Sequence, residues 1–355
     1  TRGDDVSQIL YMMGARPVWE AGSGRVIGVE VIPLAERSFP RLDVTVRASG
    51  LLRDAFPNLM ELIDRATRMI AALAEPAEVN PLARNVACDA ADLVRAGVPP
   101  EDAARRASFR VFSDRPGTYG AGVNHLLESG DWRTAADIAD VYVRWGGYAY
   151  GEGVHGRSGH DDFRRRLGRL DATLKVQDSR EHDILSGDDP NAYQGGMNAA
   201  VRALAGRDAA SYSGDSSDPR RPKVRTTAEE ARFVFRTRVL NPRWIEGMKR
   251  HGFKGAGDLA RQVELACQWD ATSGILDDWQ YREMAETYAF APVMRDFLKA
   301  HNPYALHEIA ERLLEAISRG LWEAPGDARA GLEALLLDAE GDIEDAVMED
   351  RGVGN

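Results

Sequence analysis

The order of apolar and polar residues near the start of the chain predicts a strand, a turn and a helix. Residues 43–46 alternate polar and apolar side chains, as a half-buried strand does. The pair Ser49-Gly50 interrupts this alternation, and apolar residues then recur at helical spacing over 52–73, with Pro57 suited to a first helical turn. A loop at the carboxyl end of a strand is where α/β folds usually bind ligands. The turn is therefore the first candidate for a functional site.

Strands and helices alternate through residues 1–225. The segment 188–196 is polar and Gly-rich, which predicts a loop, and 211–225 is rich in Ser, Asp, Pro and Arg, which predicts a connector or lid. Alternation of this kind predicts an α/β fold with a mainly parallel sheet and flanking helices. The further predicted strands are 25–34, 109–112 and 174–177, and the further predicted helices are 82–96, 99–107, 124–128, 134–142, 162–171 and 198–204.

From residue 226 the pattern becomes helical throughout. Thr226 precedes acidic residues that suit the first turn of a helix, and Asn241-Pro242 and Asn302-Pro303 each combine a capping side chain with a first-turn proline. We expect an α/β part over 1–225, a helical C-terminal module over 226–350 that ends in an acidic helix, and a tail over 351–355.

Composition narrows the class of protein. The chain has 355 residues and a net charge of −11, from 45 basic and 56 acidic residues. It has no long basic run, which argues against an extended nucleic-acid groove. We expect no signal peptide, and the sequence has no apolar run of the roughly 18 residues that a membrane span requires. Because Cys88 and Cys267 lie far apart and match no zinc spacing, we expect free buried thiols in a reducing cytoplasm.

The candidate turn carries four polar side chains, Arg47, Ser49, Arg53 and Asp54. One interpretation is an Arg–Asp pair that pins the turn, and the other is a clamp on the carboxylates or amides of a ligand. The pair His155 and His160 is more typical of solvated side chains than of a metal site, and we assign no metal ligand. The chain has no G-x-x-x-x-G-K-[ST] motif, so we do not expect it to hydrolyse ATP by itself.

Several collinear blocks carry a resemblance to one family. They include R-L-D-V-T-V-R-A-S-G-L-L-R-D-A-F-P-N-L (41–59) and R-V-F-S-D-R-P-G-T-Y-G-A-G-V-N (110–124). The others lie at 142–151, 177–185, 224–230, 241–256 and 319–322. Together they resemble the large subunit of the ATP-dependent metal chelatases, the CobN/magnesium-chelatase family. Subunits of that family are several times longer, and the chain also opens without a Met, so we expect a C-terminal part of a longer protein.

The resemblance implies an activity and partners. Members of the family form nitrogen–metal bonds, putting Co²⁺ into a corrin precursor of the hydrogenobyrinic acid a,c-diamide type in cobalamin biosynthesis, or Mg²⁺ into protoporphyrin. ATP would be used by an AAA+ subunit that works with an integrin-domain-like subunit. The tetrapyrrole would bind to the large subunit, and Co²⁺ or Mg²⁺ would be the substrate metal. A rival interpretation is a non-catalytic module that only docks the ATPase subunits.

The blocks W-G-G-Y-A-Y-G and Q-D-S-R-E-H-D, and the segment Y-Q-G-G-M at 193–197, look like the cobalt branch. One departure is Gln194, which stands where that branch often has a His in His-Gly-Gly. An imidazole would suit Co²⁺ better than an amide, so the departure weakens a metal-delivery role. Magnesium chelation therefore stays an alternative.

The same resemblance suggests two walls of a tetrapyrrole cavity. Catalysis would need a base for the pyrrole protons and transient ligands for the metal. The glycines would let the backbone approach a flat ligand closely. The first wall would hold Arg47, Ser49, Arg53 and Asp54, and the second Gln194, Gly195 and Gly196. Tyr119 is a further substrate-binding candidate, and the catalytic candidates are Asp54, Asp178 and His182.

Overall fold

The computed structural model describes residues 4–352, and the side chains of 5–344. It forms two compact units. The first unit contains the residues up to Asp171 and Ala199–Asp208, and the second contains Ala172–Asn198 and the residues from Ala209 onward. The units thus divide earlier in the chain than the boundary expected at residue 225. Among the described helices, none is both long and apolar enough to cross a membrane.

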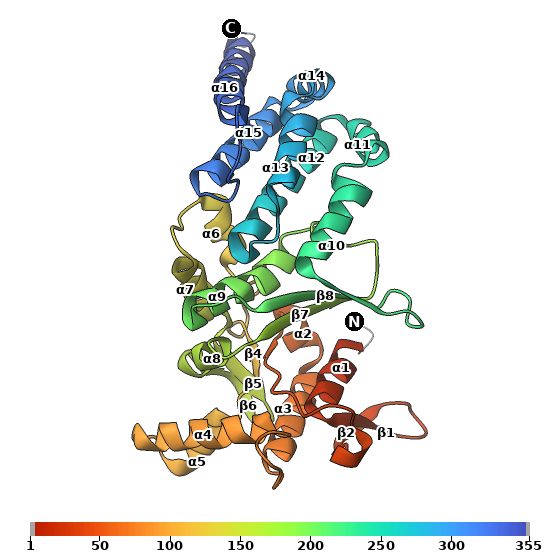
Figure 1. Ribbon diagram of the computed structural model, residues 1–355, viewed down its shortest axis with the longest axis vertical. Helices are drawn as coiled ribbons and strands as arrows, with labels where there is room; N and C mark the ends of the chain where they lie inside the picture. The colour runs from red at the N-terminus through yellow and green to blue at the C-terminus, as the bar shows by residue number, and fades with distance from the viewer. Residues whose placement is uncertain (1–3, 353–355) are drawn as a thin grey trace. The chain divides into compact units, whose positions relative to one another are not determined.

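The first unit begins with a helix and an antiparallel hairpin. The hairpin strands pair from Ala15 with Val31 to Trp19 with Val26. The helix α3 packs against both α1 and β2, and buried side chains such as Leu10 and Ile63 fill the space between these elements. The elements are α1 (Asp4–Met13), β1 (Ala15–Trp19), β2 (Val26–Val31) and the short 3-10 turn η1 (Leu34–Glu36) (Figure 1).

A four-stranded sheet carries the predicted turn. Its order is β3 (Val46–Arg47), β4 (Val111–Ser113), β5 (Tyr148–Gly151) and β6 (Val154–Ser158). The pair β3–β4 is parallel, whereas β4–β5 and β5–β6 are antiparallel. The strand predicted at 43–46 is thus a two-residue strand at the end of that segment. Since β3 and β4 run in the same direction, the loops that follow them leave the sheet at the same edge.

Helices surround this sheet. The predicted helix over 52–73 is two helices, which separate at Phe56 because a residue before a proline is disfavoured in the helical conformation. Phe112 on β4 stacks on Phe163 of α8, with ring centroids 4.7 Å apart, and this contact ties the sheet to its helices. The helices are α2 (Gly50–Ala55), α3 (Pro57–Ala71), α4 (Pro81–Arg95), α5 (Pro100–Ala107), α6 (Val123–Ser129), α7 (Ala135–Gly146) and α8 (His160–Leu167).

The second unit begins with a three-stranded sheet of order β7 (Ala172–Gln177), β8 (Ala210–Asp215) and β9 (Lys223–Thr226). The pair β7–β8 is parallel and β8–β9 is antiparallel. The prediction of a connector or lid over 211–225 is therefore wrong in part, because residues 211–215 and 223–225 are strand and 216–222 connect them. The buried positions of β8 are the adjacent residues Ser213 and Gly214, so the apolar alternation that normally reveals a strand is missing.

The predicted loop over 188–196 is also wrong in part. Residues 191–195 form a π-helical turn, η2 (Asn191–Gly195), which continues directly into α9 (Gly196–Ala205). Glycines in that segment suggested a loop, but here they are buried inside a helix. Single π-helical turns inside helices are frequent at functional sites.

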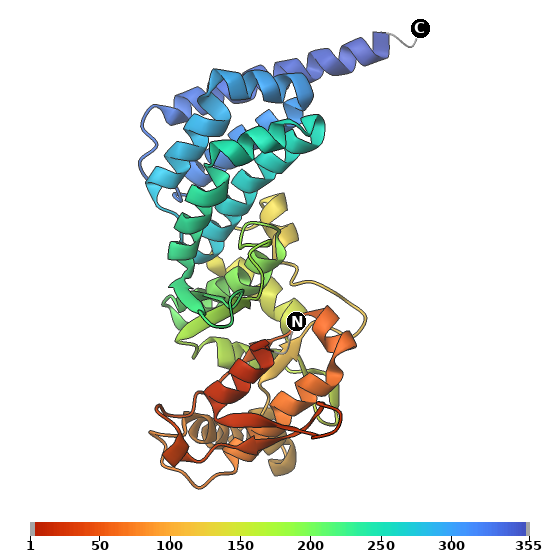
Figure 2. The ribbon, with the colours of Figure 1, turned by 90° about the vertical axis from the view of Figure 1, so that its right-hand side faces the viewer.

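The rest of the second unit is helical, as predicted. The helix α12 (Gly252–Ser273) packs beside α15 (Pro303–Ser318), as Figure 1 and the turned view of Figure 2 show. Asn241 and Asn302 cap the helices that follow them, as predicted, and Thr226 forms a capping box with Glu229. The other elements are α10 (Thr227–Val234), η3 (Phe235–Val239), α11 (Pro242–Lys249), α13 (Asp278–Met284), η4 (Ala285–Phe290), α14 (Pro292–His301) and α16 (Ala328–Gly352).

The predicted α/β class with a helical C-terminal part is confirmed. The predicted mainly parallel sheet needs one correction. Among the described strands two pairings are parallel and four are antiparallel, so the sheets are small and mixed. Cys267 is a free buried thiol as expected, but Cys88 is free and exposed. Of the predicted tail, residues 351–352 end α16, and 353–355 lie outside the described residues.

Candidate functional site

The predicted turn is held at the edge where β3 and β4 end. Ser49 caps α2, and its Oγ accepts a hydrogen bond from the backbone N–H of Leu52 at 3.2 Å. Ser49 therefore stabilises the first turn of the helix. The loop after β4, residues 114–120, meets this turn because the two strands are parallel neighbours.

Asp114 joins both arginines of the turn. Its carboxylate accepts hydrogen bonds from Arg47 Nη1 at 3.0 Å and from Arg53 Nη1 at 3.4 Å. All three side chains are buried, with exposed fractions of 2% for Arg47, 1% for Arg53 and 0% for Asp114. A buried carboxylate between two buried guanidinium groups fixes both of them in place.

Backbone carbonyl groups accept further hydrogen bonds from these two arginines. Arg53 Nη1 also donates to the carbonyl oxygens of Arg115 at 2.9 Å and Thr118 at 3.1 Å, and Arg47 Nη2 donates to that of Gly120 at 3.1 Å. These bonds bind the 114–120 loop to the turn. The interpretation in which an Arg–Asp arrangement pins the turn describes these contacts, although the acidic partner of Arg47 is Asp114 rather than Asp54.

Asp54 faces outward from the same cluster. Arg53 holds its carboxylate with two parallel bonds, Nε to Oδ1 at 2.6 Å and Nη2 to Oδ2 at 2.8 Å, and the hydroxyl of Tyr119 donates to Oδ2 at 2.7 Å. The bonds from Arg53 and then from Tyr119 hold the pKa of Asp54 well below its ordinary value. The hydrogen bond between Tyr119 and Asp54 also raises the pKa of Tyr119, so the phenol stays protonated at neutral pH.

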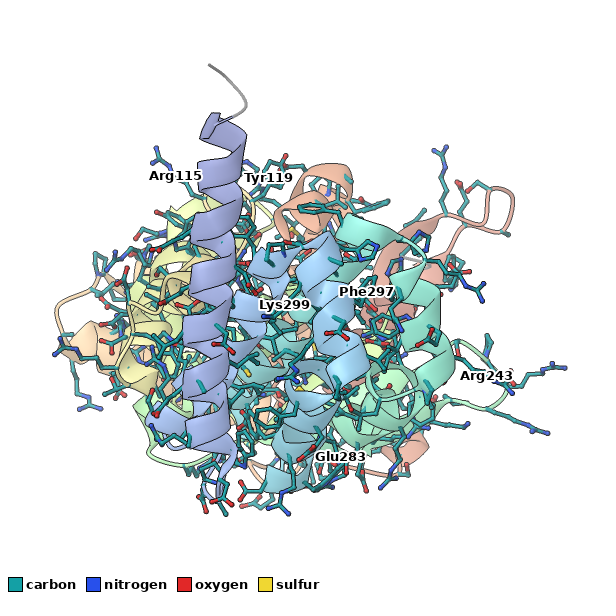
Figure 3. All side chains as sticks on the ribbon, turned by 90° about the horizontal axis from the view of Figure 1, so that it is seen from above. Arg115, Tyr119, Arg243, Glu283, Phe297 and Lys299 are labelled. Atoms are coloured by element: carbon teal, nitrogen blue, oxygen red, sulfur yellow. The ribbon has the colours of Figure 1, made fainter. Side chains whose placement is uncertain are left out.

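This geometry separates the predicted roles. Asp54 is 41% exposed and Tyr119 is 61% exposed, so both can meet a ligand. Arg115, also exposed, precedes Tyr119 by four residues on the same loop, and both are labelled in Figure 3. A carboxylate with a lowered pKa is a weak proton acceptor, so Asp54 is better suited to accept hydrogen bonds or balance charge than to act as a base.

Gly50 allows the loop and the turn to approach this closely. A Cβ atom at this position would lie 2.6 Å from Asp114 Oδ2 and 2.9 Å from the carbonyl oxygen of Thr118. Neither atom can move without breaking the contacts that hold Arg53. Any residue other than glycine at position 50 would therefore push the two loops apart.

The second predicted group lies in the second unit, on the π-helical turn. Gln194 Nε2 donates to the carbonyl oxygen of Tyr212 at 2.9 Å, and Gln194 is buried. Gly195 is also required by packing, since a Cβ there would lie 2.1 Å from Asn191 Oδ1 and 2.5 Å from Thr272 Oγ1. Gly196 is buried where α9 begins. These residues fix the helix to β8 and α12.

Asp178 and His182, the other catalytic candidates, are exposed in the segment after β7. Ion pairs of their neighbours hold this segment: Arg180 Nη1 lies 2.8 Å from Glu230 Oε1, and Arg238 Nη2 lies 2.6 Å from Asp183 Oδ1. The structure thus brings Arg47, Ser49, Arg53, Asp54 and Tyr119 together in the first unit. It places Asp178, His182, Gln194, Gly195 and Gly196 in the second unit.

Two residues of the first cluster were missed by sequence reasoning. Asp114 is its buried centre, and Tyr150 donates from its hydroxyl to the carbonyl oxygen of Asp114 at 2.7 Å. The position of Asp114 directly after a predicted strand was a usable signal, because its loop leaves the sheet beside the turn.

Across the described part of the chain, no group of three or more His, Cys, Asp or Glu residues could hold a metal ion. His160 instead lies between Ser158 and the carbonyl of Arg144.

Comparison with known proteins gives the family. Residues 1–329 match the description CobN/Magnesium Chelatase. The chain is 49% identical over 340 residues to the aerobic cobaltochelatase subunit CobN of Pseudomonas aeruginosa, covering 96% of this chain and 27% of that protein. It is 31% identical over 357 residues to a magnesium-chelatase subunit of Chlorobaculum parvum, covering 99% of this chain and 27% of that protein.

A solved structure of a cobaltochelatase subunit is also similar to this chain. The catalytic subunit of cobaltochelatase from Mycobacterium tuberculosis superposes with a TM-score of 0.90 at 45% sequence identity, over 95% of this chain and 28% of that one. The chain therefore spans little more than a quarter of the length of the relatives it matches. With a family match over residues 1–329, the chain belongs to the CobN/magnesium chelatase family.

Proposed function

We propose that this chain is part of the large subunit of an ATP-dependent cobaltochelatase, which inserts Co²⁺ into a corrin precursor of the hydrogenobyrinic acid a,c-diamide type. The observation that carries the proposal is the similarity over almost the whole chain, which reaches 49% identity with a cobaltochelatase subunit against 31–34% with magnesium-chelatase subunits. The structural likeness to a cobaltochelatase catalytic subunit supports the same branch.

The outward face of the first cluster would bind the macrocycle. Asp54 offers an exposed carboxylate that can accept hydrogen bonds from amide side chains, and Tyr119 offers an aromatic surface for a flat ring. Arg47 and Arg53 would support binding indirectly, because they hold the loop that carries Tyr119. Gln194, Gly195 and Gly196 remain candidates for substrate binding in the second unit, and His182 and Asp178 remain candidates there for proton or metal handling.

ATP would be hydrolysed by a partner AAA+ subunit that works with an integrin-domain-like subunit. The lack of a phosphate-binding P-loop motif in this sequence fits that division of labour. Co²⁺ would be the substrate metal. Mg²⁺ insertion into protoporphyrin is the second candidate, because the chain also matches magnesium-chelatase subunits across nearly all of its length.

A ligand titration tests the proposed wall. The large subunit that carries this chain is titrated with hydrogenobyrinic acid a,c-diamide and with protoporphyrin IX, and binding is read from the absorbance of the macrocycle. Asp54→Asn removes the charge and Tyr119→Ala removes the aromatic surface at the outward face, and each should weaken corrin binding roughly tenfold.

Glu20→Gln, an exposed change at the tip of the β1–β2 hairpin, is the matched control and should leave binding unchanged. Corrin affinities within twofold of the wild type for both site variants would show that this face is not the wall. Tight binding of protoporphyrin but not of the corrin would favour the magnesium branch. Binding of neither ring, with the ATPase partner still bound, would favour a docking module.

A further inference from the structure

His155 lies beside the first cluster because of a bulge in the β5–β6 hairpin. Ala149 pairs with Arg157 but Tyr150 pairs with His155, so Gly156 is the extra residue in β6. Gly156 has a φ of +69°, and a Cβ there would lie 2.4 Å from Cγ of Pro116. The bulge thus presses β6 against the 114–120 loop and re-aims the side chain next to it, as bulges near active sites commonly do.

Tyr150 links His155 to the buried contacts of the site. The imidazole meets the Tyr150 ring edge-on, with centroids 5.3 Å apart and planes at 90°. The hydroxyl of Tyr150 donates to the carbonyl oxygen of Asp114, and Arg53 Nη1 donates to the same oxygen at 3.1 Å. The Tyr150 ring that contacts the imidazole is therefore linked through the carbonyl of Asp114 to Arg53, which also holds Asp54.

His155 is also an electrostatic neighbour of Asp54. After Arg53 and Tyr119, its imidazole is among the groups that lower the pKa of the Asp54 carboxyl. Both side chains are exposed. Tyr150 from β5 contacts the imidazole and Asp54 from α2 interacts with it electrostatically, whereas Arg53 and Tyr119 are the residues that hold Asp54.

Metal insertion requires this surface to accept a proton. When a corrin takes up the metal, its inner N–H bond breaks, the electron pair of that nitrogen forms a bond to the divalent metal, and the proton passes to a base. Arginine stays protonated, the phenol of Tyr119 stays protonated because of Asp54, and the Asp54 carboxylate is a weak acceptor. Histidine is the residue type whose ordinary titration range lies near neutral pH, which makes it the suitable proton acceptor on this surface.

We propose that His155 is a proton-accepting catalytic residue of this site, with Asp54 stabilising the imidazolium that forms. One pyrrole proton moves to an imidazole nitrogen while the nitrogen electron pair moves to the metal, and solvent then removes the proton from the imidazolium. This inference rests on the proposed function. It also assigns Asp54 a supporting electrostatic role in place of the role of base.

The test uses the reconstituted chelatase, with the large subunit carrying His155→Gln or, as the matched control, His125→Gln. His125 is an exposed histidine on α6 that pairs with Glu128. We expect His155→Gln to lower the rate of Co²⁺ insertion about 100-fold, the usual size of a lost acid–base group, with corrin affinity within threefold of the wild type. The acidic limb of the pH–rate profile should disappear with it.

A third variant, His155→Ala, separates chemistry from structure. Added imidazole should restore its insertion rate in proportion to concentration, which a purely structural histidine would not allow. The inference is overturned if His155→Gln inserts Co²⁺ within threefold of the wild type with the same pH profile. The inference is also overturned if His155→Gln inserts Co²⁺ slowly only because it binds the corrin more weakly. A wild-type enzyme that neither binds the corrin nor inserts Co²⁺ would instead overturn the proposed function.

Discussion

The substitution Asp114→Asn tests whether one buried carboxylate holds the candidate site together. The side chain keeps its size but loses its charge, so Arg47 and Arg53 lose a negative partner at 3.0 Å and 3.4 Å in a buried environment. Breaking a buried ion pair from one side costs about 3–5 kcal/mol. Because Arg53 keeps both bonds to Asp54, and carbonyl groups remain for both arginines, we expect the lower end, about 3 kcal/mol.

Two measurements check this value. Thermal unfolding of the chain should show the transition of the first unit lowered by about 6–12 °C, the shift that 3 kcal/mol produces in a unit of this size. Hydrogen exchange should report the same change locally. The amides of Val46 and Ala48 donate to the carbonyls of Arg110 and Phe112 at 2.7 Å and 2.8 Å across the β3–β4 pair, and they should exchange roughly 100-fold faster.

The control is Glu30→Gln, which removes one partner of the half-exposed pair Arg16–Glu30 in the β1–β2 hairpin. Exposed pairs contribute about 0–1 kcal/mol, so this variant should unfold close to the wild type. If Asp114→Asn costs less than about 1 kcal/mol and leaves exchange at β3 unchanged, the buried charges do not hold the loop against the turn, and the reasoning is refuted.

Three further predictions concern packing and pH. Gly50→Ala should destabilise the first unit by about 2 kcal/mol through overpacking, whereas Gly28→Ala, with no neighbour within 4 Å of its Cβ, should stay within about 0.5 kcal/mol in urea unfolding. Gly195→Ala should cost about 2 kcal/mol and weaken protection of the π-helical turn in hydrogen exchange. Burial favours a raised pKa for Asp43, but Arg110, Asn85 and Arg166 together outweigh burial and lower that pKa, so the stabilisation is present above about pH 4 and is lost as pH falls through the folded-state pKa. Asp43→Asn should therefore flatten the acid limb of stability against pH.

Local patterns predicted the candidate turn well. Its strand, its capping serine and its charged residues all lie within a few positions of one another, and the structure keeps them together. Asp114 could not be paired with Arg47 in this way, because 67 positions separate them and only the parallel pairing of β3 with β4 joins their loops. The burial of both arginines could not be predicted either, since it depends on carbonyl groups of the distant loop.

Other elements were hidden by their residue types. Strand β8 places Ser213 and Gly214 at buried positions, so no apolar alternation marks it. The π-helical turn at 191–195 contains a glycine that resembles a loop residue, yet packing against Asn191 and Thr272 requires that glycine. The helical part from residue 227 was predictable because capping residues and apolar periodicity are local signals.

The most direct test of the proposed function is metal insertion by the reconstituted enzyme. The large subunit carrying this chain is combined with its ATPase partners and offered Co²⁺ with hydrogenobyrinic acid a,c-diamide, or Mg²⁺ with protoporphyrin IX. We expect ATP-dependent formation of the cobalt corrin, at a rate at least about tenfold above any formation of magnesium protoporphyrin. Formation of magnesium protoporphyrin alone, or of neither product while both rings and all partners are present and folded, would contradict the account.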